Sequence, residues 1–203
     1  MANELQGKKI AILLAPVGSE QAEFEQPKKA VEDAGATVDV VGLQTGDAQT
    51  MNSDVNPGDT FTVEKTFSEV SADEYDGLVV PGGTVGADKL RGSDEAVSFV
   101  HSFFDQAKPV GVICHGPWTL VEADVVKGRT LTSYPTLKTD IRNAGGNWVD
   151  EEVVVDQGLV TSRNPDDVAA FCAKVVEEFA EGKHESRTRS AGARQGTQPR
   201  ATH

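Results

Sequence analysis

The chain has 203 residues, of which 38% are hydrophobic and 25% are charged, and its net charge at pH 7 is -13. This length and composition are ordinary for one soluble α/β domain with a substantial core. An acidic protein repels phosphate backbones, so the charge argues against nucleic acid as a main partner. No stretch approaches about 18 consecutive apolar residues, and MANELQGKK lacks the apolar core of a signal peptide, so we expect a cytoplasmic protein with no membrane partner.

The charge is unevenly distributed along the chain. Residues 183–203 hold five basic side chains against one acidic side chain, a net +4, which leaves -17 for residues 1–182. The terminal segment is also polar and poor in apolar residues, a composition typical of disorder. We therefore expect one folded domain over 1–182 and a disordered, polar, basic tail over 183–203.

The hydrophobic pattern predicts strands that alternate with helices. In the first half of the chain the expected elements are a buried strand at 9–15, a helix at 20–34, a strand at 37–43, short antiparallel strands within 45–67, a buried strand at 75–80 and a helix at about 93–106. In the second half they are a strand at 110–113, a helix from 116, a brief strand at 130–135, a helix at 135–144, a hairpin within 148–162 and a helix from 164 to about 180.

Such alternation indicates βαβ units, and hence a mostly parallel sheet with helices on both faces. The expected fold is a flavodoxin-like three-layer sandwich of six or seven strands. In sheets of this kind, functional sites gather at the carboxyl ends of the strands. Two glycine-containing segments, PGGTVGADKLR and CHGPW, follow predicted strands directly and would lie at that edge.

Cys114 occupies an abrupt join, because it ends the strand VGVI and stands two residues before a helical run. A join of this kind is typical of a nucleophile elbow, which raises a strained side chain above the sheet. The amides at the start of the helix would favour a thiolate and offer an oxyanion site. The alternative is a small buried hydrophobic residue. That simpler interpretation suits Cys172, on the apolar side of the last predicted helix, and we expect both cysteines to be thiols.

Acid and base candidates lie close to the elbow in sequence. His115 follows the cysteine and could act as a base, an acid or an oriented donor. Glu20, Glu23 and Glu25 crowd the segment after the first strand, where they either form an acidic first helical turn or point into the sheet edge. A glutamate beside a thiolate would have a raised pKa and become a protonated donor to sulfur. The sequence pattern leaves open which glutamate this is.

Taken together, six motifs resemble the DJ-1/PfpI superfamily, whose members have a glutamine-amidotransferase-like domain. Within it the chain is similar to the PfpI-like branch of intracellular cysteine peptidases and general stress proteins. The resemblance runs from about Lys8 to Gly182. The motifs are E-x-x-E before Pro27, LVVPGG, ADKLR, KPVGVICHGPW, LTSYPTLKTDIRNAGGNWVDEEVVVD and LVTSRNPDD.

The resemblance implies a role for particular residues. Cys114 would be the elbow nucleophile, His115 its partner and Glu23 the glutamate that hydrogen-bonds the sulfur, while Glu20 matches a second acid of the pocket. The carboxylate that orients the histidine would be Asp88, supplied by a neighbouring subunit of a dimer or hexamer. The family often has glutamate at that position, so aspartate is a departure.

The resemblance also implies two classes of function. In the first, a Cys114 thiolate attacks carbonyl groups, either hydrolysing peptides or converting methylglyoxal-type aldehydes in deglycase or glyoxalase chemistry. In the second, the protein is a non-catalytic sensor or chaperone whose Cys114 becomes oxidised. The absence of a His-x-Glu pair after Arg163 argues against glutamine amidotransfer. No cofactor, nucleotide or metal site is expected, since no suitable cluster of ligands is evident.

Overall fold

The structure is a computed structural model that describes residues 3–183. Apart from Lys183, the tail predicted at 183–203 lies outside the described residues, so its disorder remains a prediction. No helix within residues 3–183 is long and apolar enough to cross a membrane.

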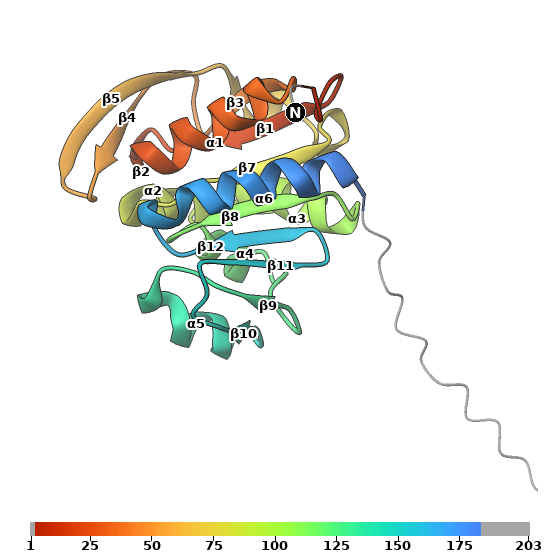
Figure 1. Ribbon diagram of the computed structural model, residues 1–203. Coiled ribbons are helices and arrows are strands. Elements are labelled where there is room, and N and C mark those ends of the chain that lie inside the picture. The colour runs from red at the N-terminus through yellow and green to blue at the C-terminus, as the bar shows by residue number, and fades with distance from the viewer. Residues whose placement is uncertain (1–2, 184–203) are drawn as a thin grey trace, which may run out of the picture.

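A seven-stranded sheet forms the centre of the protein and confirms the expected flavodoxin-like architecture (Figure 1). The strand order is β11-β12-β8-β7-β1-β3-β6, and every pair is parallel except β11 with β12. The strands are β1 (Lys9–Leu13), β3 (Thr37–Gly42), β6 (Lys65–Thr66), β7 (Gly77–Val80), β8 (Val110–Ile113), β11 (Val153–Asp156) and β12 (Leu159–Ser162).

Helices cover both faces of this sheet. In Figure 1, α1 and α6 lie in front of it, and α3 and α4 lie behind. Strand β1 contributes to both cores, since Ile10 and Ile12 pack with α1 and α6 whereas Ala11 and Leu13 pack toward α3 and α4. The helices are α1 (Gln21–Asp33), α2 (Thr84–Arg91), α3 (Asp94–Asp105), α4 (Pro117–Glu122), α5 (Lys138–Asn143) and α6 (Val168–Glu181).

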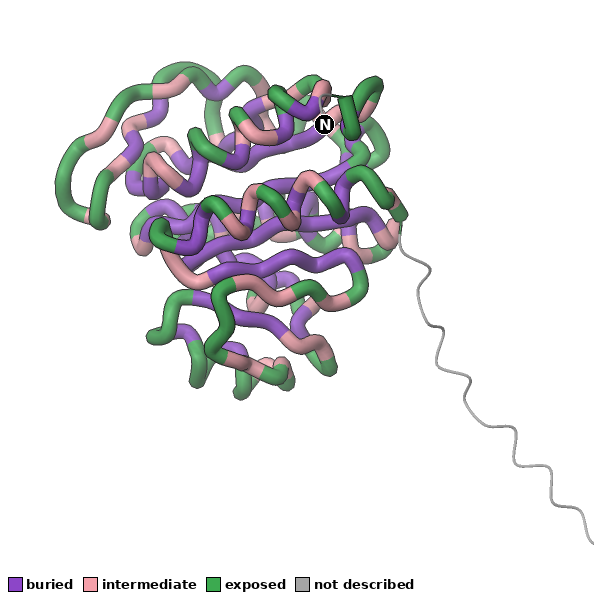
Figure 2. The backbone as a smooth tube through the Cα atoms, viewed as in Figure 1, coloured by how far each residue is buried: buried purple, intermediate pink, exposed green. Residues whose placement is uncertain are grey.

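The central strands are buried along nearly their whole length, whereas exposed residues concentrate on the outer helix surfaces and connections (Figure 2). Helix α6 can lie close to the sheet because two strand residues have no side chain. A Cβ at Gly111 would stand 2.7 Å from Val175 Cγ2, and one at Gly77 would stand 3.0 Å from the Phe179 ring. These glycines therefore allow the helix to pack directly on β7 and β8.

A curved arm projects from one end of the central sheet (Figure 1). It consists of β4 (Gly46–Asn52) and β5 (Asn56–Val63), which pair antiparallel as predicted, and β2 (Val17–Glu20), which pairs with β4. At the tip, Ser53 and Asp54 have φ values of +54° and +63°. Two successive residues in the left-handed region make a tight reversal that asparagine, aspartate and glycine tolerate best.

Two parts of the fold differ from the sequence-based expectation. The segment PGGTVGADKLR contains α2, which the pattern did not reveal, because the inward face of this short helix consists of Gly86, Ala87 and Leu90 and gives little apolar periodicity. The hairpin expected within 148–162 begins only at β11. Trp148 instead belongs to β10 (Asn147–Trp148), which pairs with β9 (Thr130–Leu131) in a separate two-stranded sheet.

Candidate functional site

Cys114 stands at the carboxyl end of β8 in a left-handed conformation, with φ at +62°. This region is strained for a residue with a Cβ, so neighbouring contacts must maintain it. The Cys114 N–H donates to Ser162 O at 3.1 Å, and its carbonyl accepts from Tyr134 N at 2.8 Å. A Cβ at Gly116 would stand 3.0 Å from Val80 O, which explains the small residue there. The predicted elbow is confirmed.

The amides near the sulfur are not the ones expected from the sequence. Gly116 N donates to Ile113 O and Trp118 N donates to His115 O, while Pro117 has no N–H to offer. The backbone hydrogen bonds to the sulfur come instead from Gly83 and His115. The expectation that the first amides of α4 serve the site is therefore wrong, because the chain's own carbonyls occupy them.

Burial decides the protonation state of Cys114. The residue is only 5% exposed, and burial together with the adjacent Glu23 carboxyl raises the pKa of the thiol, against the opposing effect of the Gly83 and His115 amides. This shift favours the thiol over the thiolate that the sequence led us to expect. The sulfur carries a proton at neutral pH and needs a base to become a nucleophile.

Glu23 is the glutamate that points into the site. It lies in the first turn of α1, is fully buried, and its Oε2 accepts a hydrogen bond from Gly82 N at 2.9 Å. Burial raises the pKa of Glu23 to about 8, a rise that a hydrogen bond with Cys114 opposes and the charge of Glu20 supports. A carboxyl with this pKa is mostly protonated at neutral pH, in agreement with the proposed donor next to sulfur.

His115 is in direct contact with the cysteine. Its Nδ1 lies 3.2 Å from Cys114 Sγ. The imidazole stacks on Tyr134, with ring centroids 4.6 Å apart and planes inclined by 25°, and it also touches Trp118 at 5.2 Å. Burial lowers the pKa of His115, whereas the charge of Asp54 raises it. The ring is therefore held by aromatic neighbours and is neutral near pH 7, with Nδ1 in contact with the thiol.

The tip of the β4–β5 arm reaches the other side of this histidine. Thr84 Oγ1 lies 3.4 Å from His115 Nε2 and donates to Asp54 Oδ2 at 3.0 Å, and Thr84 N donates to Asp54 Oδ1 at 2.7 Å. Sequence reasoning did not find Asp54 and Thr84. No local signal marks them, because their contact joins residues 30 positions apart through the curvature of the arm.

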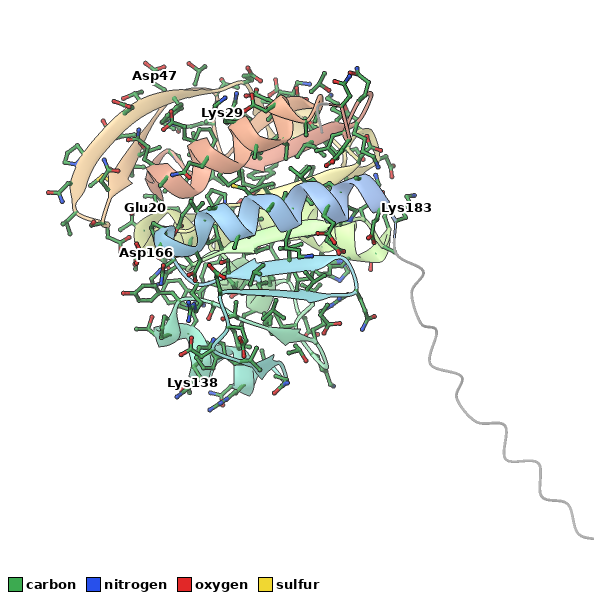
Figure 3. All side chains as sticks on the ribbon, viewed as in Figure 1. Glu20, Lys29, Asp47, Lys138, Asp166 and Lys183 are labelled. Carbon is green, nitrogen blue, oxygen red and sulfur yellow. The ribbon has the colours of Figure 1, made fainter. Side chains whose placement is uncertain are left out.

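Glu20 supports the arm rather than the sulfur. Its carboxylate accepts hydrogen bonds from Ser53 N at 3.0 Å and from Asp54 N at 3.3 Å. Figure 3 labels Glu20 on the side of the molecule toward which the arm curves. Glu20 is thus buried at the edge of the site, and its contacts fix the position of the hairpin tip.

Asp88 is a predicted site residue, but within a single chain it does not lie beside Cys114. It lies exposed on α2, one turn after Thr84, and its side chain forms no hydrogen bond or ion pair with any other described residue. Its action across a subunit interface remains a prediction. Within residues 3–183, no group of three or more His, Cys, Asp and Glu side chains is arranged to hold a metal ion.

Fold and site together define a flavodoxin-like α/β protein with a cysteine at a strained join between a strand and a helix. The sequence model of the DJ-1/PfpI family matches residues 8–178, and the chain belongs to that family. It is 40% identical over 164 residues to YraA of Bacillus subtilis, which is named a putative cysteine protease, and the match covers 81% of this chain and 94% of YraA. It is 41% identical over 176 residues to the Staphylococcus aureus protein SAV1875, covering 85% and 98% of the two chains.

Solved structures agree with this assignment. Drosophila melanogaster DJ-1beta superposes with a TM-score of 0.76 at 31% identity, over 89% of this chain and 91% of that one. A two-domain protein from Anabaena variabilis, with DJ-1/ThiJ/PfpI-like and ferritin-like domains, superposes with a TM-score of 0.78 at 34% identity. The match covers 85% of this chain and 48% of the Anabaena protein, so the chain spans about half of that protein's length.

The buried Glu23 carboxyl predicts a distinct pH dependence of stability. Because its pKa is raised from 4.5 to about 8, its contribution to stability is complete below about pH 4.5 and is lost as the pH rises through about 8. In Glu23→Gln the charge cannot form, so the variant should be more stable than wild type at pH 9 by about 3 to 5 kcal/mol. Urea unfolding at pH 5 and pH 9 measures the difference.

Glu25→Gln is the matched control, because Glu25 lies on the same helix but is exposed. The free energy of unfolding of Glu25→Gln should differ little from that of wild type, and by a similar amount at both pH values. Parallel stability curves for wild type and Glu23→Gln would contradict a neutral buried Glu23.

Proposed function

We propose that the protein is a cysteine-dependent stress-response enzyme in which Cys114 attacks the carbonyl carbon of small methylglyoxal-type aldehydes or their adducts. The observation that carries this proposal is the contact of 3.2 Å between Cys114 Sγ and His115 Nδ1 at a strained elbow. A thiol with a base at this distance can be converted to a nucleophile without a metal or an organic cofactor.

The contacts of the site support a balanced sequence of steps. The Cys114 S–H bond breaks as its proton moves to His115 Nδ1. The electron pair that remains on sulfur then forms a C–S bond to the aldehyde carbon. The carbonyl electrons pass to the oxygen, which the protonated Glu23 and nearby amides can stabilise. The oxygen takes up the proton held by His115, which completes the thiohemiacetal. One proton then moves from C1 to C2 and the hydroxyl proton at C1 moves to the oxygen at C2, which gives a thioester. Water hydrolyses the thioester to a hydroxy acid and the free thiol.

Burial favours small carbonyl compounds over peptides as substrates. Cys114 and His115 are each 5% exposed, and the rings of Tyr134 and Trp118 pack against His115. The bulk of an extended peptide hinders its approach to a recessed sulfur, whereas an aldehyde of a few atoms is small enough to reach it. Peptide hydrolysis remains the other form of the same cysteine chemistry, and the name of YraA favours it.

Turnover of methylglyoxal tests the proposal. Wild type should form lactate, and Cys114→Ala should lose this activity by at least about a hundredfold, because no other residue supplies the nucleophile. Cys172→Ala is the matched control and should retain wild-type turnover, since Cys172 is a half-buried residue of α6 that makes none of the hydrogen bonds of the site. Lactate formation by Cys114→Ala would overturn the proposal. Cleavage of peptides without lactate formation would favour the peptidase form.

A second candidate function is oxidation sensing through Cys114. The observation that favours it is the protonated Glu23, which could donate a hydrogen bond to a sulfinate oxygen. Mass spectrometry after graded peroxide treatment tests this role. A sensor should accumulate Cys114 sulfinate at doses that leave Cys172 unmodified, and Glu23→Leu should raise the required dose. Equal oxidation of the two cysteines would exclude selective sensing.

The proposal includes assembly into a homo-oligomer, either a dimer or a hexamer. Two apolar side chains beside Asp88 support an interface there, since Val17 is 36% exposed and Val85 is 47% exposed. The two residues belong to segments that touch, because a Cβ at Gly18 would stand 2.6 Å from Val85 Cβ. An interface over α2 would cover this apolar surface and bring neighbouring Asp88 side chains near a second chain.

A further inference from the structure

The proposed chemistry requires one particular tautomer of His115. Nδ1 faces the cysteine at 3.2 Å, so it must be unprotonated to accept the thiol proton. The neutral ring must then carry its hydrogen on Nε2. The partner of Nε2 therefore decides whether the histidine is ready to act as a base.

That partner is Thr84, whose hydroxyl has a single hydrogen. Thr84 Oγ1 lies 3.0 Å from Asp54 Oδ2 and 3.4 Å from His115 Nε2. A carboxylate can only accept, so the threonine hydrogen points to Asp54. The threonine oxygen then presents a lone pair to the imidazole, and Nε2 must be the atom that donates.

We propose that Asp54, acting through Thr84 of the same chain, is a positioning residue that holds His115 in the Nε2–H tautomer and so prepares Nδ1 to take the proton of Cys114. This inference deepens the proposed function, because it assigns what prepares the base of that reaction. When the S–H bond breaks and the Nδ1–H bond forms, the electron pair remains on sulfur. The resulting imidazolium then lies in a hydrogen-bonded chain that ends on the Asp54 carboxylate.

The surroundings of Asp54 show how it is held for this role. Its backbone is in the left-handed region, and its N–H and that of Ser53 are both bonded to the Glu20 carboxylate. The aspartate side chain also accepts from Thr84 N at 2.7 Å, at the first residue of α2. The tip is thus fixed from β2 and from α2, and a strained conformation maintained in this way is typical of functional sites.

The charged and titratable groups that face His115 are few. Cys114 and the protonated Glu23 lie on the Nδ1 side, while Asp54 lies on the Nε2 side with Glu20 behind it. Tyr134 stacks on the ring, and Trp118 packs against it at an inclination of 59°. Asp54 is the charged group that favours the protonated imidazole, because the charge raises the pKa of His115 against the effect of burial.

Nitrogen-15 NMR of the histidine rings tests this inference directly. Comparison with His115→Gln identifies the His115 signals among those of the four histidines of the chain. Above its pKa, His115 of the wild type should be in the Nε2–H form, and Asp54→Asn should shift it toward Nδ1–H. An asparagine amide can donate to Thr84, which turns the threonine hydrogen toward Nε2. The pKa of His115 should also fall in Asp54→Asn.

Three further variants separate positioning from structural effects. Thr84→Val should abolish the tautomer preference, whereas Thr84→Ser keeps the hydroxyl and should restore it. Asp47→Asn makes the same charge change in the same arm, on its outer side away from Glu20, and should leave His115 unchanged (Figure 3). Methylglyoxal turnover should fall about tenfold or more in Asp54→Asn and Thr84→Val but not in Thr84→Ser.

Two results would overturn the inference. One is a wild-type His115 in the Nδ1–H form. The other is a tautomer that responds to Asp88→Asn and not to Asp54→Asn, which would assign the role to the neighbouring subunit. If the tautomer and its response to Asp54→Asn are as expected but wild type does not convert methylglyoxal, the positioning role stands and the proposed substrate fails.

Discussion

The left-handed backbone of Cys114 is the constraint on which the rest of the site depends. At φ +62° the side chain is turned away from the direction of β8 and meets Glu23, Gly83 and His115 at once. Hydrogen bonds to Ser162 and Tyr134 hold this conformation from two other segments of the chain. The strain is thereby offset by the fold, and the sulfur occupies one position relative to its acid and its base.

Burial then sets where the protons lie. It raises the pKa values of Cys114 and Glu23 and lowers that of His115, so each of the three groups is neutral near pH 7. A neutral site of this kind is stable in a low-dielectric environment, yet it holds an acid, a base and a nucleophile in contact. Charge develops only when the thiol proton moves to the imidazole, and Asp54 is placed where it stabilises that charge.

The sandwich could be predicted because its strands are continuous apolar runs between turn residues, as at Lys9–Leu13 and Gly77–Val80. The elbow and Glu23 could be identified because sequence motifs carry them. Helix α2 could not, since Gly86 and Ala87 give its buried face no apolar pattern. The protonation state of Cys114 could not be predicted either. It depends on how far burial, which raises the pKa of the thiol, outweighs two backbone amides, which lower it. The contact between Asp54 and Thr84 depends on the curvature of the arm, which no local residue pattern specifies.

The relative reactivity of the two cysteines tests most directly whether His115 activates Cys114. Cys172 is an internal reference, because burial raises its pKa to about 11 and its thiol forms no hydrogen bond with another of residues 3–183. Alkylation by iodoacetamide at pH 7, followed by mass spectrometry of both sites in one sample, gives the two rates. The account predicts that Cys114 reacts faster than Cys172 in wild type and loses this advantage in His115→Gln. An unchanged Cys114 rate in His115→Gln would contradict it.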